Sequence, residues 1–196
     1  MSKFRIAAAL VFACLLPLTL SACNNSLFKV KPASELPPLS DAAATFNAGT
    51  VTFKAAPLLS DEQTQELFEA NLQLAGLLPV RLELTHNSGE PLQFKKVRLR
   101  LHDESGTEFK MISAKQAVSR ILKANDITLY NPNARKNFEK DFRAYELDLK
   151  TPFTHAEGKR QGLVVFQSPK KDPVASPRGL VLSIEGLAQP ITLKLN

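Results

Sequence analysis

Tryptophan is absent from this sequence, and cysteine and histidine are scarce: there are two cysteines and three histidines among 196 residues. Cys14 lies inside an apolar N-terminal run, so a chain that has lost this run keeps only Cys23. A single cysteine excludes an intramolecular disulfide and a cysteine-rich metal site. The core must therefore be built from Leu, Val, Ile and Phe. The sequence also lacks G-x-S-x-G, H-E-x-x-H and glycine-rich phosphate loops, so no common catalytic motif is present.

Long apolar runs are rare as well, and the clearest one is too short to span a bilayer. Lys3 and Arg5 precede residues 6–22, which are almost wholly apolar. As a helix this run would extend about 25 Å, whereas the hydrocarbon core of a bilayer measures about 30 Å. A positive head, a short apolar run and small residues at its end are typical of a secretory signal peptide. We therefore expect residues 1–22 to be a cleaved signal.

The end of that run, Leu20-Ser21-Ala22-Cys23, resembles the lipobox of bacterial lipoproteins. The resemblance implies that the Cys23 thiolate accepts a diacylglyceryl group and that a signal peptidase cuts between Ala22 and Cys23. The mature chain would then be anchored in a membrane of the bacterial envelope through its lipid. Asn24 follows the cysteine, whereas Asp at this place retains enteric lipoproteins at the inner membrane, so the outer membrane is favoured. An ordinary secreted protein is the alternative.

Charge is distributed unevenly along the chain. The net charge of +6 becomes +4 when Lys3 and Arg5 are removed with the signal. Residues 95–143 carry 12 basic and 6 acidic residues. Such a segment can bind anionic lipid, lipopolysaccharide or an acidic partner, or it can be solvated surface. Nucleic acid is not an expected partner, because no aromatic-basic RNA-binding motif occurs.

Proline and small residues separate the signal from the rest of the chain. Residues 23–48 contain Pro32, Pro37 and Pro38 and lack sustained periodicity, which predicts a lipidated flexible tether spanning about 28 Å. Residues 49–196 are long enough for a single domain with its own core.

Hydrophobic periodicity predicts a β-rich domain with helical inserts. Three helices are expected near residues 61–75, 114–124 and 133–143. Ser60 with Gln63 and Ser113 with Gln116 have capping-box spacing, and Asn133 is a candidate cap for the third helix. Alternation of apolar and polar residues predicts half-buried antiparallel strands. They are expected near residues 51–53, 80–84, 97–101, 109–112, 145–149, 163–166, 180–184 and 191–195.

About eight short strands separated by turns are typical of an immunoglobulin-like antiparallel β-sandwich, with the helices as inserts at its ends. The stretch EGKRQGLVVFQSP, residues 157–169, resembles the penultimate strand of telokin-like immunoglobulin folds in bacterial extracellular lipoproteins. The resemblance implies the same sandwich shape over residues 79–196.

Candidate sites are few. His86 and His102 should lie on the order of 30 Å apart in a hairpin turning near residues 87–90, and His155 falls in a loop, so neither a metal ion nor another cofactor is expected. A basic docking surface is a candidate on the second and third helices; it comprises Lys115, Arg120, Lys123, Arg135 and Lys136. The alternative is that these helices only cap the core and show their charges to water.

Together these features predict a membrane-anchored envelope lipoprotein that acts as a non-enzymatic binding or scaffolding module for an envelope protein partner. A carrier of a small apolar or lipid ligand, held between the sandwich and the helices, is the alternative. A hydrolase with a dispersed site is a third hypothesis, since catalytic triads assemble in space.

Overall fold

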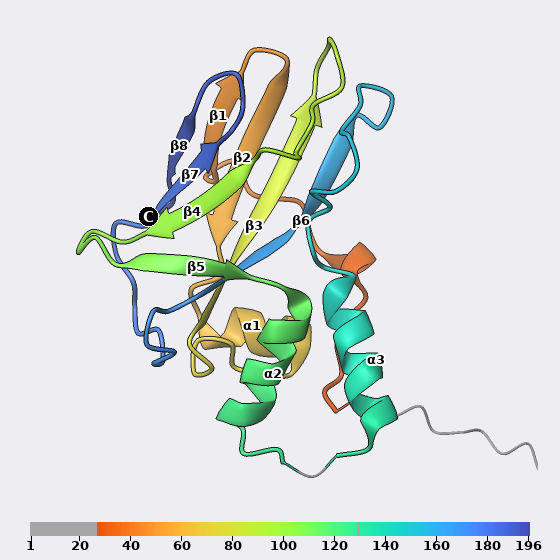
Figure 1. Ribbon diagram of the computed structural model, residues 1–196, viewed down its shortest axis with the longest axis vertical. Helices are drawn as coiled ribbons and strands as arrows, with labels where there is room; N and C mark the ends of the chain where they lie inside the picture. The colour runs from red at the N-terminus through yellow and green to blue at the C-terminus, as the bar shows by residue number, and fades with distance from the viewer. Residues whose placement is uncertain (1–26, 129) are drawn as a thin grey trace, which may run out of the picture.

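The computed structural model describes residues 27–128 and 130–196 of the chain (Figure 1). The predicted signal, the lipobox and the acylation site at Cys23 lie outside these residues. The described elements, in chain order, are η1 (Ala33–Glu35), β1 (Ala44–Ala48), β2 (Val51–Pro57), α1 (Asp61–Phe68), β3 (Leu77–His86), β4 (Arg98–His102), β5 (Glu108–Ile112), α2 (Ala114–Ala124), α3 (Pro132–Arg143), β6 (Lys159–Gln167), β7 (Val181–Glu185) and β8 (Ile191–Lys194).

The strands form one sheet, so the predicted immunoglobulin-like sandwich, including the version implied by residues 157–169, is wrong. The order of the eight antiparallel strands is β1-β2-β3-β6-β5-β4-β7-β8. The sheet curls until its edge strands β1 and β8 lie side by side, which nearly closes it into a barrel (Figure 1). Alternation along a strand shows that one face is buried, but it does not distinguish two stacked sheets from one curled sheet.

Strand β5 makes the sheet continuous. Its first half pairs with β4, at Leu101 opposite Phe109, and its second half pairs with β6, at Ile112 opposite Val165. Without this bridging strand the two halves would be separate sheets, as a sandwich requires. The predicted hairpin between residues 80–84 and 97–101 is also wrong, because β3 pairs with β2 and β6 while β4 pairs with β5 and β7.

Two apolar cores lie on opposite faces of the sheet. In β6, Val164 and Phe166 point into the barrel, whereas Leu163 and Val165 join a second core beneath the helices. Strand β3 is buried along almost its whole length, so the expectation of a half-buried sheet fails there. The helices cover the outer face of β6 and the first residue of β3, Leu77. Further along β3, Arg81 donates to Pro37 O in the N-terminal segment and Glu83 pairs with Lys159 of β6, so these contacts explain the difference.

Local signals located the helices well. Both predicted capping boxes are present, and α2 spans the predicted residues 114–124. Helix α1 is shorter than predicted because Glu69 adopts a left-handed φ of 49° directly after Phe68. Helix α3 begins one residue earlier than predicted, with Asn131 rather than Asn133 as its cap and Pro132 in its first turn.

The described part of the predicted tether is not a free coil. Strand β1 lies within residues 23–48 and pairs with β2, so the folded domain begins before residue 49. Upstream, Lys31 N donates to Leu67 O at 2.9 Å, and the hydroxyl of Tyr145 donates to Lys31 O at 2.7 Å. The prolines that suggested a linker instead flank η1: Leu36 is buried in the core beneath the helices, and Pro37 O accepts from Arg81 of β3.

Candidate functional site

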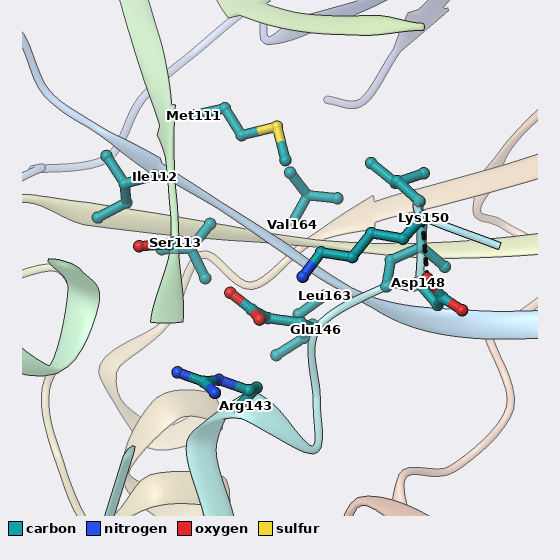
Figure 2. Close-up of a pocket in the computed structure, with 12 residues that line it drawn as sticks. Met111, Ile112, Ser113, Arg143, Glu146, Asp148, Lys150, Leu163 and Val164 are labelled. Carbon is teal, nitrogen blue, oxygen red and sulfur yellow. Dashed lines mark hydrogen bonds between the residues drawn. The ribbon is translucent and has the colours of Figure 1, made fainter. Parts of the chain in front are cut away.

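A groove of about 530 Å³ opens where β5 and residues 143–150 diverge along β6 (Figure 2). Its apolar floor comprises buried residues of both cores, including Ile112, Leu147 and Leu163. Met111 lies at its edge with 42% of its surface exposed, although it belongs to a strand of the barrel. The site is therefore an apolar depression that opens to the protein surface.

Charged side chains of both signs border this floor. Arg143, Glu146, Asp148 and Lys150 line the groove, and the ammonium of Lys150 extends toward the Glu146 carboxylate (Figure 2). Glu146 is held in place because it accepts a hydrogen bond from the backbone N of Ala114, at the start of α2. The rim therefore offers two cations and two anions to whatever occupies the groove.

Hydrogen bonds also fix Asp148. The Thr151 hydroxyl and the backbone N–H groups of Lys150 and Thr151 donate to its carboxylate. These bonds, first of all the one from the Thr151 side chain, lower the pKa of Asp148, and the charge of Arg160 adds to the effect. Asp148 therefore stays ionised under all but strongly acidic conditions.

The wall formed by residues 145–150 is fastened directly to β6. Leu163 N donates to Tyr145 O at 2.6 Å, and Leu147 N donates to Leu163 O at 2.9 Å. This close approach needs a glycine: a Cβ on Gly162 would lie 2.6 Å from Leu147 Cα. Gly162 belongs to the stretch that resembled an immunoglobulin-like strand, and in this protein it makes room for the groove wall.

Arg160 holds the next part of that wall. Its guanidinium makes a paired contact with Glu157 and donates to the carbonyl oxygens of Asp148, Thr151 and Pro152, at 2.6–3.0 Å. The side chain is buried, with its guanidinium carbon 5.1 Å from the centre of the Phe153 ring. Arg160 itself does not line the groove, but it fixes the loop whose first residues, Asp148 to Lys150, do.

The predicted basic surface is only partly free. Arg120 donates to Ala75 O and Lys171 O, so it ties α2 to two loops. Arg135 donates to the hydroxyls of Ser119 and Tyr130, so it ties α3 to α2. The remaining three members of the set, Lys115, Lys123 and Lys136, are exposed. The structure therefore does not bring the five cations together as one free patch.

The histidines are arranged differently from the prediction. His86 is 2% exposed, and its ring centroid lies 6.0 Å from that of His155, whose Nδ1 is 3.0 Å from His86 O. His102 lies on β4, which is not a neighbour of β3. Within residues 27–128 and 130–196, no group of three or more His, Cys, Asp or Glu side chains could hold a metal ion.

No sequence pattern predicted the groove. Its residues come from β5, β6 and the segment after α3, and periodicity predicted a strand in place of that segment. Gly162 inside an apolar strand was the one available signal, because such a glycine often marks a close backbone approach.

In the described part of the chain, no helix combines the length and the apolar character needed to cross a membrane. No family model, curated protein or solved structure matches this chain.

Proposed function

We propose that this chain is a lipid-anchored protein of the bacterial envelope that acts as a non-enzymatic binding module. The lipobox sequence at residues 20–23 supports the anchor. The groove between β5 and residues 143–150 supports the binding role, and its apolar floor with exposed Met111 is the observation that carries it. Its volume falls within the range of about 300–1,000 Å³ that is common for binding pockets.

A segment of a partner protein fits this groove better than a carried lipid does. The floor can receive an apolar side chain, and the rim of Arg143, Glu146, Asp148 and Lys150 can pair with polar groups on either side of it. Exposed methionine suits such a contact because its flexible side chain adapts to the shape of its partner. A mixed rim adds specificity, since partners with the wrong charge pattern are rejected.

The space between the barrel and the helices, where a carried ligand was the alternative, is filled. The side chains of Ile121, Phe138 and Phe142 pack there against Leu163 and Val165 of the sheet, and all of them are buried. The groove, by contrast, opens to the surface. We therefore place binding on the surface of the barrel rather than between the layers.

Photo-crosslinking in intact cells tests the groove. A benzophenone amino acid at Met111 should give a discrete protein adduct, whereas the same probe at Leu74 should not. Leu74 is a matched position, since it is 48% exposed and lies away from the groove. Leu149→Gln should abolish the Met111 adduct because Leu149 lines the groove. Leu187→Gln should preserve it, since Leu187 packs on the barrel core elsewhere.

The outcomes separate the parts of the proposal. Equal adducts from Met111 and Leu74, or an adduct that survives Leu149→Gln, contradict binding in the groove. The anchor is tested by Cys23→Ser, which should lose the acyl mass and leave the membrane fraction. A Cys23→Ser protein that stays membrane-bound at the normal processed mass contradicts the anchor and leaves the crosslinking result to be judged separately.

A further inference from the structure

The described chain begins against the helical layer, beside α3 (Figure 1). The ring of Phe28 lies 5.0 Å from that of Phe138, in the middle of α3. The backbone N of Lys29 donates to the Glu69 carboxylate at 2.9 Å, directly after α1. The chain is thus attached to the domain only a few residues after Cys23.

This attachment limits how far the domain can stand from the membrane. Leu27 is four positions after Cys23 in the sequence, and a chain extends at most about 3.6 Å per position. An acylated Cys23 therefore lies within roughly 14 Å of Leu27, half of the distance expected for a flexible tether that runs to residue 48. An acylated Cys23 would therefore hold the part of the domain at Leu27 close to the bilayer.

Exposed cations lie at this end of the molecule. Lys29 follows the proposed acylation site by six residues, Lys123 is in the last turn of α2, and Lys136 is in the first half of α3. Two exposed acidic residues lie beside them: Asp126 in the connection between α2 and α3, and Glu69, whose carboxylate accepts from Lys29 N. Arg135 is turned to Ser119 and Tyr130, so the three lysines carry the positive charge of this surface.

We propose that the connected ends of α2 and α3, with Lys29, Lys123 and Lys136, rest on an anionic phospholipid surface. The inference relies on acylation of Cys23, which belongs to the proposed function. Short attachment and positive charge act together, because lysines held near a charged bilayer attract its headgroups over about one Debye length. This orientation turns the tip of β3 away from the membrane, since that tip lies at the opposite end of the molecule (Figure 1).

Site-directed fluorescence on the lipidated full-length mature protein tests the orientation. Once Cys23 is acylated, the mature sequence has no other cysteine, so Asn133→Cys and Ser88→Cys each accept one probe. Asn133 is exposed at the start of α3, and Ser88 is exposed just beyond β3. In vesicles of phosphatidylcholine with phosphatidylglycerol, a spin-labelled headgroup lipid should quench the probe at position 133 strongly and the probe at position 88 weakly.

Charge is tested with a matched pair of triple variants. The first variant combines Lys29→Gln, Lys123→Gln and Lys136→Gln. It should reduce the ratio of molecules with the α2–α3 end on the bilayer to molecules with that end away from it. The reduction should be about fivefold per lysine, on the order of a hundredfold in all. The control, with Lys95, Lys96 and Lys194 changed to Gln, removes the same charge from exposed sites off the helices and should retain quenching. Pure phosphatidylcholine vesicles should reproduce the effect of the first variant.

Each result decides something. Equal quenching at positions 133 and 88, or stronger quenching at 88, overturns the orientation. Quenching that is insensitive to both the first triple variant and the lipid charge overturns the electrostatic contact. Mass spectrometry of the starting protein keeps the two proposals apart. A missing acyl mass contradicts the anchor. An acylated protein whose probe at position 133 is far from the lipid headgroups contradicts only the proposed orientation.

Discussion

Replacing Arg160 with alanine should lower the free energy of unfolding by about 3 kcal/mol. The guanidinium makes five hydrogen bonds, two to the Glu157 carboxylate and three to backbone carbonyls. It also lies 5.6 Å and 5.1 Å from the ring centres of Phe94 and Phe153. Alanine removes every one of these contacts at once, and it leaves the loop that forms the groove wall without its main attachment.

The magnitude follows from what each partner can do after the change. Breaking a buried charged pair costs about 3–5 kcal/mol when the remaining charge stays buried. Arg160 has 8% of its side-chain surface exposed but Glu157 has 36%, so water can rehydrate the carboxylate. We therefore take the lower end of the range. Arg160→Lys keeps a charge but has at most three donors, so it should cost roughly 1–2 kcal/mol for the two bonds that it cannot make.

Urea denaturation followed by far-ultraviolet circular dichroism measures this effect. In a thermal scan by the same method, Arg160→Ala should lower the melting temperature by about 6–12 °C for a chain of this size. Arg143→Ala is the control: its ion pair with Glu139 joins residues four apart on α3, and its side chain is 59% exposed. That pair contributes about 0.5 kcal/mol. Equal losses for Arg160→Ala and Arg143→Ala would show that the buried network does not stabilise the fold.

Two further predictions concern the same framework, and a third concerns the N-terminal segment on α3. Gly162→Ala should destabilise the protein by about 1–3 kcal/mol because its Cβ meets backbone, and a urea midpoint equal to that of the native protein would rule out this close approach. Hydrogen bonds from Arg160 lower the pKa of Glu157 below its usual 4.5, so the stability gained from the ionised carboxylate is complete above pH 4.5 and is lost as the pH falls through the lowered pKa. Glu157→Gln should therefore flatten the dependence of the free energy of unfolding on pH in this acidic range. An unchanged acid slope in urea titrations contradicts the assignment. Phe28→Ala should cost about 1 kcal/mol through its lost ring contact with Phe138 and should speed amide exchange in residues 27–31; unchanged exchange there, measured by mass spectrometry, means that the segment is not held by this contact.

Secondary structure was predicted best where its signals are local. Ser113 and Gln116 define the start of α2 because the capping box involves residues three apart, and the structure confirms that helix. Alternation likewise located several strands, such as β4 around residues 97–101, and the continuous apolar run at residues 163–166 located β6. The segment after α3 was an exception: its alternating residues touch β6 at a single bridge, Glu146 with Leu163, rather than along a strand. Alternation alone does not show whether a partner strand runs alongside.

The candidate site was predicted less well, because it depends on contacts between distant residues. Nothing in the sequence around Arg160 indicates that it is buried, yet it donates to the carbonyl of Asp148, twelve residues earlier. Arg120 read as part of a docking face, yet it binds the carbonyl of Lys171, 51 residues away. No periodicity in the sequence distinguishes an exposed cation from one that loop carbonyls surround.

The sequence by itself determined the features that depend on neighbouring residues: where the helices begin, which strand faces are apolar, and the lipobox from which anchoring is proposed. Only the tertiary structure decided the order of the strands, the bridging position of β5 and the single curled sheet. Strand order depends on pairings between segments far apart in the chain, and no local preference encodes them. The groove exists because β5 and residues 143–150 meet β6 from different directions, so it too was decided by these long-range pairings.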